Sequence, residues 1–167
     1  MSIQEYFKKY DLTTFDGRKA ALTELLGLRT ENGDESTGDI DTFKPELLEY
    51  LPGEDREKAK GETVVVRFRP DRWMLNGLEY VQGGILASMM DCVCGPMSDV
   101  VSNGHSAGTL DMLTTYFRPI TMKDDEIIVR VCLTENSKRV MHFELKLFNS
   151  KGKLAVEAVT NIMKAVS

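Results

Sequence analysis

The sequence predicts an α+β fold, in which an antiparallel sheet wraps around one long buried helix and a helical extension precedes the sheet. Three observations carry this prediction: a β-branched run at residues 62–70, an apolar run of helical length at 82–101, and four strand-like runs after it. Short turns join the last strands, and helices do not alternate with strands. This order favours an antiparallel sheet over an α/β architecture.

The first 60 residues predict a helical N-terminal extension that contains an acidic loop. Residues 2–28 are expected to be helical, with Thr14 or Asp16 capping the apolar part of the helix. The polar, glycine-containing stretch 30–42 is typical of a surface loop. We expect the extension to act as a helical cover over the open side of the domain.

A second, short helix is expected at the end of this extension. Pro45 suits the first turn of a helix, and the segment would end at Pro52-Gly53. Leu47 and Leu48 would then point inward.

Residues 61–167 are predicted to form the main domain. The run ETVVVRFRP predicts a strand that ends at Pro70. The run QGGILASMMDCVCGPMSDVV is apolar on most sides, which predicts a buried helix. Pro96 is expected to kink this helix or to end its regular part near Cys92–Gly95. Four strands are expected to follow, at residues 109–119, 126–135, 139–149 and 153–165. In the third of these, apolar and polar residues alternate, which predicts one buried face.

Composition excludes several classes of partner. The net charge of −5 argues against nucleic acid and against an acidic membrane surface. An odd number of cysteines and an N-terminus without the apolar core of a leader peptide predict a reducing, cytoplasmic location. No apolar run is expected to reach membrane-spanning length. Cys92 and Cys94 point to different sides of a helix and only two histidines exist, so we expect no metal.

The predicted buried helix has one face of small residues. Gly84, Ala87, Ser88, Asp91 and Gly95 share one side at helical spacing. Such a stripe leaves a slot, which either a neighbouring backbone or a ligand can occupy, and spacing alone favours close packing.

Asp91 is the single carboxylate on that face. A carboxylate within an apolar helix must be paired, hydrogen-bonded or neutral. One interpretation is a buried ion pair with Arg118 or Arg67, and the other is a general base or nucleophile with a raised pKa. The spacing leaves both open.

Gly83 and Gly84 come where this helix begins. The first N–H groups of a helix lack partners within the helix, and together with the helix dipole they stabilise negative charge. The oxyanion formed in thioester hydrolysis is such a charge. The alternative is a tight turn into the helix, which any pair of glycines serves.

These residues resemble the hotdog-fold thioesterases, in the branch that includes the phenylacetic-acid-degradation thioesterase and thioesterase superfamily member 2. The matching positions, in order, are Asn76, Gln82-Gly83-Gly84, Asp91 and Thr109-Leu110-Asp111, followed by the run YFRPI at 116–120. The resemblance covers residues 61–166 and implies the hotdog fold.

The resemblance also implies roles. Asp91 would activate water or attack the thioester, Gly83 would donate its N–H to the thioester oxygen, and Thr109 would orient Asp91 or the water. Asn76 would hold the substrate or the water. In such enzymes the site spans a subunit interface, which implies a homodimer and often a dimer of dimers. Acyl-CoA would be the substrate, with coenzyme A entering only as part of it and no separate cofactor.

Gln82 departs from the branch, which usually has histidine at this position. Glutamine can donate a hydrogen bond but cannot carry a proton. We therefore retain two functions: an acyl-CoA thioesterase, and a hotdog protein that binds acyl-CoA without hydrolysing it. A lipid-responsive transcription factor is disfavoured, since the N-terminal segment has no basic recognition helix.

Four further residues are candidates for substrate binding. Gly84 and Ser88 lie on the small-residue face, near the expected reaction centre. Lys138 and Arg139 open a predicted strand where related enzymes often contact coenzyme A, although the sequence slightly favours a solvated turn.

Overall fold

The computed structural model describes residues 3–31 and 42–165, so most of the predicted acidic loop lies outside the described residues. In chain order the elements are α1 (Ile3–Phe7), α2 (Phe15–Glu31), β1 (Glu46–Leu51), β2 (Thr63–Phe68), η1 (Arg72–Met74), α4 (Gly83–Val101), β3 (Ser106–Tyr116), β4 (Ile127–Asn136), β5 (Val140–Phe148) and β6 (Leu154–Lys164).

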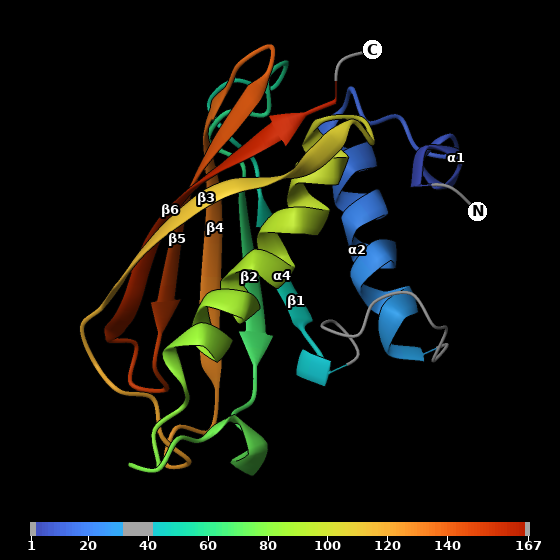
Figure 1. The fold of residues 1–167 in the computed structure, drawn as a ribbon. Coiled ribbons are helices and arrows are strands. Elements are labelled where there is room, and N and C mark those ends of the chain that lie inside the picture. Colours follow the sequence, from blue (N-terminus) through green and yellow to red (C-terminus); the bar gives the residue numbers. More distant parts are fainter. Residues whose placement is uncertain (1–2, 32–41, 166–167) are drawn as a thin grey trace.

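Six strands form one antiparallel sheet in the order β1-β2-β4-β5-β6-β3. The sheet curves around α4, which packs on its concave face, and α2 lies alongside α4 toward β1 (Figure 1). The predicted antiparallel sheet around one long helix is confirmed. Because β3 is at one end of the sheet, its outer edge has no strand partner within the described part of the chain.

The core lies between α4 and the inward-facing side chains of the strands. On β5, Met141, Phe143, Leu145 and Leu147 are buried, while His142 and Glu144 between them are exposed. This alternation confirms the predicted one-sided strand. From α4, Met89, Met90 and Met97 are fully buried against the sheet.

The N-terminal helix is divided, which the sequence did not predict. Residues between α1 and α2 form a turn in which the Asp11 carboxylate accepts a hydrogen bond from the Thr13 N–H at 3.1 Å. The Thr14 hydroxyl then accepts from the Gly17 N–H at 3.1 Å. Thr14 is thus the cap of α2, one of the two predicted candidates.

The prediction of a short helix beginning at Pro45 is wrong, because residues Glu46–Leu51 form edge strand β1. The backbone of Glu46–Leu51 pairs with β2, so the open edge of β2 decides the conformation. Leu47 packs partly against the core, whereas Leu48 is 40% exposed rather than inward. The N-terminal extension is therefore helical in α1 and α2 but contributes a strand to the sheet.

Helix α4 continues through Pro96 to Val101, so the predicted end of its regular part near Cys92–Gly95 is wrong. It is also long and apolar enough to cross a membrane, contrary to the expectation that no run reaches that length. Since 56% of that stretch is buried inside the fold, α4 serves as the core helix of this domain.

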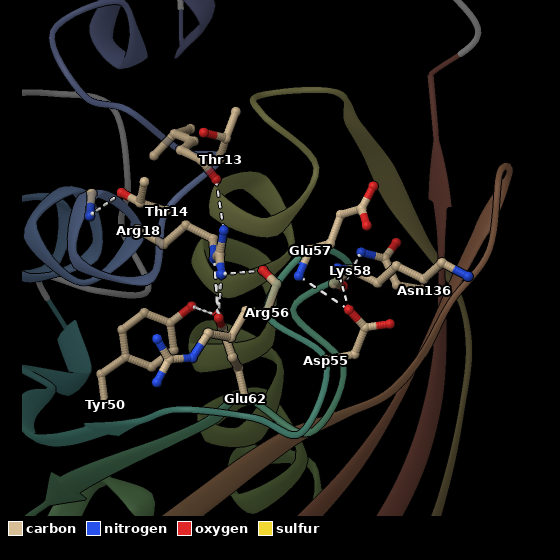
Figure 2. Close-up of polar contacts among 12 residues, drawn as sticks. Thr13, Thr14, Arg18, Tyr50, Asp55, Arg56, Glu57, Lys58, Glu62 and Asn136 are labelled. Carbon is tan, nitrogen blue, oxygen red and sulfur yellow. Dashed lines mark hydrogen bonds and ion pairs between the residues drawn. The ribbon is translucent and has the colours of Figure 1, made fainter.

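A buried polar network attaches α2 to the sheet (Figure 2). The Arg18 guanidinium donates from Nε to both oxygens of Glu62, at 3.2 and 3.0 Å, and its Nη2 also contacts that carboxylate. The remaining donors reach the carbonyls of Leu12 and Arg56, at 2.8 and 3.2 Å. The Tyr50 hydroxyl donates to the other Glu62 oxygen. Burial and the Glu62 carboxylate raise the pKa of Tyr50, so its hydroxyl stays protonated as a donor.

Candidate active site

Asp91 lies on the exposed face of α4 and accepts a hydrogen bond from β3. The Thr109 Oγ1 donates to Asp91 Oδ1 at 3.0 Å, and both side chains are exposed within the protomer. The structure therefore brings together two of the predicted site residues, which are 18 positions apart in the chain. A carboxylate held by a hydroxyl and open to the surroundings can take a proton from water.

The interpretation of Asp91 as part of a buried ion pair is wrong. The guanidinium of Arg118 donates to the Leu154 carbonyl at 2.5 Å. That of Arg67 pairs with Glu46 and with Glu126. Neither cation contacts Asp91, so its charge is not neutralised by the arginines that the sequence offered.

The small-residue face of α4 is open in this chain. A Cβ added at Gly84 or Gly95 would meet no atom within 4 Å, and Ser88 and Asp91 are exposed. The Ser88 hydroxyl donates back to the Gly84 carbonyl at 2.9 Å, so it is already satisfied. No neighbouring backbone of the described chain occupies the slot, contrary to the close packing that spacing favoured.

The N-terminus of α4 presents unpaired amide groups. Gln82 is the N-cap residue, and its carbonyl accepts from the N–H groups of Ile85 and Leu86 at 3.0 and 3.1 Å. The N–H groups of Gly83 and Gly84 have no partner within the helix, and they point beyond its end. This geometry suits a developing oxyanion, which is the role that the resemblance implies for Gly83.

Asn76 and Gln82 brace the loop before α4. The Asn76 side-chain oxygen accepts from the N–H groups of Leu78 and Tyr80, at 2.9 and 3.2 Å. The Gln82 amide donates to the Leu75 carbonyl at 3.5 Å, a long contact. Both side chains therefore hold backbone in this protomer, and both are exposed.

A cavity of about 320 Å³ opens beside this loop. It is lined by Asn76, Tyr80, Val81, Gly83, Leu86, Tyr116, Phe117, Arg118 and Pro119. Asp91 is outside this lining, because it lies eight residues beyond Gly83 on the same helix, which is ~12 Å at 1.5 Å rise per residue. Within this chain the acid and the amide donors thus lie too far apart to reach one carbonyl.

Tyr116 is the site residue that sequence reasoning missed. Its hydroxyl donates to the Gly83 carbonyl at 2.8 Å, across 33 positions of the chain. The ring also explains the glycine, since a Cβ at position 83 would lie 3.1 Å from Tyr116 Cζ. The aromatic residue stood inside the quoted run YFRPI, but no sequence pattern predicts a contact over this separation.

The remaining candidates for substrate binding lie away from the cavity. Lys138 and Arg139 are exposed in the turn between β4 and β5, and neither lines the cavity.

Burial and the nearby Asp91 charge raise the pKa of the Cys94 thiol well above its ordinary value, so Cys94 is a poor nucleophile. Within residues 3–31 and 42–165, histidine, cysteine and acidic side chains form no group able to hold a metal ion.

The sequence matches one family model over its central region. Residues 78–156 match the model described as the thioesterase superfamily. This stretch includes α4, strands β3, β4 and β5 and the start of β6, and with them Gly83, Asp91 and Thr109. Among curated proteins, none matches the chain significantly.

Solved structures of thioesterases share the fold. Zebra fish thioesterase superfamily member 2 superposes with a TM-score of 0.69 at 16% identity, covering 87% of this chain and 97% of its own. A variant of the phenylacetic acid degradation protein PaaI from Thermus thermophilus gives 0.62 at 18% identity, covering 75% and 96%. A hypothetical thioesterase from Streptococcus pneumoniae, solved with coenzyme A, gives 0.60 at 18% identity, covering 75% and 90%. The fold is therefore the hotdog fold.

Proposed function

We propose that this protein, whose residues 78–156 belong to the thioesterase superfamily, hydrolyses an acyl-CoA thioester to a free acid and coenzyme A. The observation that carries the proposal is Asp91, hydrogen-bonded to Thr109 at 3.0 Å on an open helix face. A carboxylate placed beside an unfilled slot is what a general base or a nucleophile needs.

The chemistry follows from the two groups on α4. As a base, Asp91 takes a proton from water while the water oxygen bonds to the thioester carbon, and the carbonyl oxygen becomes an oxyanion held by the Gly83 N–H. The carbon–sulfur bond then breaks, and the departing thiolate takes the proton from Asp91. In the alternative, Asp91 attacks the carbon itself, the carbon–sulfur bond breaks with departure of the thiolate, and water hydrolyses the acyl-aspartate. Label found in Asp91 after a single turnover in ¹⁸O-labelled water would identify this second path, with water attacking the carboxyl carbon of Asp91; the direct path labels only the free acid.

Two copies of the chain complete the site in this proposal. Asp91 and Gly83 of one protomer lie ~12 Å apart along α4, so the donors for one carbonyl must come from the other protomer. The unpaired edge of β3 offers the interface. Its exposed apolar side chains are Leu110, Leu113 and Tyr116, of which Leu113 is 71% exposed. An open edge with apolar side chains favours pairing with another strand.

Subunit mixing tests this shared site. Asp91→Ala and Asn76→Ala chains are each expected to be nearly inactive alone. Once unfolded and refolded together, they should regain about a quarter of the wild-type activity, because half of the dimers are mixed and each mixed dimer has one intact site. The measurement is thiol release from acyl-CoA by the refolded mixture.

The mixing experiment carries its own control. Refolding each variant alone gives the background. A double variant with both substitutions on one chain, mixed with wild type, gives mixed dimers in which each shared site lacks one residue, so these mixed dimers should be inactive. Activity that never exceeds the sum of the separate variants, with mixed dimers present, would contradict a site shared between chains.

Removing the Thr109 hydroxyl is expected to slow hydrolysis. Thr109→Val keeps the shape of the side chain but loses the hydrogen bond to the Asp91 carboxylate. Hydrogen bonds to charged groups contribute about 1.5–3 kcal/mol, so kcat should fall roughly 10- to 100-fold. Thr109→Ser keeps the hydroxyl and is expected to retain most of the rate. Equal rates for the valine and serine variants would remove Thr109 from the mechanism.

The second candidate is an acyl-CoA-binding protein without hydrolysis, and Gln82 is the observation that favours it. Its amide cannot exchange a proton with the substrate, and it is already directed at the Leu75 carbonyl. Coenzyme A phosphates would be bound by Lys138 and Arg139 in either function, since both are exposed cations. Tight binding across a panel of acyl chains without thiol release would favour this candidate.

A further inference from the structure

Tyr116, the last residue of β3, joins the sheet to the first turn of α4. Its hydroxyl donates to the Gly83 carbonyl at 2.8 Å, and its ring lies against the Cα of Gly83, which a side chain would displace. Partial burial raises the pKa of the Tyr116 phenol above its ordinary value, so the hydroxyl remains a donor at neutral pH. The contact is made at the end of α4 that carries the unpaired N–H groups.

The bonded carbonyl controls the direction of an amide. The Gly83 carbonyl and the Gly84 N–H belong to one planar peptide unit, so a restraint on the oxygen fixes the N–H direction. The Gly83 N–H adjoins this unit across a single residue. Glycine has the largest backbone freedom of any residue, and consecutive glycines at a helix end lack the side chains that would limit it. The hydroxyl of Tyr116 supplies that limit.

We propose that Tyr116 is a positioning residue, which holds the Gly83–Gly84 turn so that its N–H groups point at the carbonyl oxygen of the bound thioester. The inference rests on the proposed function, because it assigns these amides to that oxygen. The inference also explains why glycine at position 83 occurs together with tyrosine at position 116. Gly83 leaves room for the Tyr116 ring, and the Tyr116 hydroxyl restrains the backbone dihedral angles that glycine leaves free.

Tyr116 also lines the 320 Å³ cavity and is 48% exposed, so it could instead contact the substrate along its length. The two roles differ in what they recognise. A positioning role affects only ligands that have a carbonyl for the amides to bind, whereas a direct contact affects every ligand that fills the cavity.

The test uses the full-length Tyr116→Phe variant, which keeps the ring, and two unreactive ligands. One is a CoA ketone in which a methylene replaces the thioester sulfur, and the other is an S-alkyl-CoA of the same length without a carbonyl. We expect the variant to lose about tenfold in affinity for the ketone and to bind the thioether within about twofold of wild type. For a substrate, kcat should fall about tenfold with KM nearly unchanged.

Tyr10→Phe is the matched control. In the wild type, the Tyr10 hydroxyl contacts Glu24 on α2, away from the cavity lining. The affinities of this variant for the ketone and for the thioether should therefore stay at the wild-type value. Equal weakening of both ligands by Tyr116→Phe, or no change in either, would overturn the positioning role. If wild-type protein binds both ligands but releases no thiol from any acyl-CoA, hydrolysis fails as a function while the ligand comparison still decides the role of Tyr116. A wild-type protein that binds neither ligand would overturn both.

Discussion

Asp91→Asn is expected to lower kcat for acyl-CoA hydrolysis by roughly two to four orders of magnitude. Asparagine has the same shape and can still accept the hydrogen bond from Thr109, but it can neither take a proton from water nor form an acyl-enzyme. Both mechanisms therefore require the carboxylate. The measurement is thiol release under saturating substrate, together with the affinity for an unreactive acyl-CoA analogue.

The expected split between rate and affinity makes this result specific. Because Asp91 is exposed within the protomer and forms no ion pair with Arg67 or Arg118, the substitution should leave the thermal midpoint close to wild type. Asp111→Asn is the control, since that carboxylate bonds to Asn161 on β6. A rate for Asp91→Asn within about twofold of wild type would exclude Asp91 as base or nucleophile.

The sheet and core helix were predictable because their patterns are local. Alternation along β5 and the apolar run of α4 each record burial within one element, and burial in this fold follows those elements. Strand β1 was not predictable in the same way. Its residues ELLEYL have no clean alternation, and what makes them a strand is the free edge of β2, an element later in the chain.

The candidate site shows the same division. Small residues spaced along one face of α4 pointed to a slot, and Asp91 and Thr109 do meet there. The sequence could not decide between an ion pair and a free carboxylate, because that depends on which partner each arginine finds elsewhere. Arg18 is a further example. It lies among ordinary surface-type residues of α2, yet it is 2% exposed, and all three of its guanidinium nitrogens donate to Glu62 or to the carbonyls of Leu12 and Arg56.

Arg18→Met is expected to lower the free energy of unfolding by about 3–5 kcal/mol. The substitution leaves the Glu62 carboxylate, 1% exposed, with only the Tyr50 hydroxyl, and an unpaired buried charge is strongly destabilising (Figure 2). Urea unfolding followed by circular dichroism measures the change.

Replacing both ends of the pair separates the lost charge pairing from lost packing. Arg18→Met combined with Glu62→Leu removes the buried charge altogether, and such replacements are often neutral or stabilising, so the double variant should be more stable than Arg18→Met alone. Lys60→Met breaks an ion pair with Glu135 that is exposed on both sides, and it should leave the urea midpoint nearly unchanged. If Arg18→Met unfolds at the same urea concentration as wild type, the network does not fasten α2, and the packing of α2 on α4 must hold it instead.

Since α4 carries both Gly83 and Asp91, a loosened α2 should also reduce hydrolysis at temperatures below the unfolding transition.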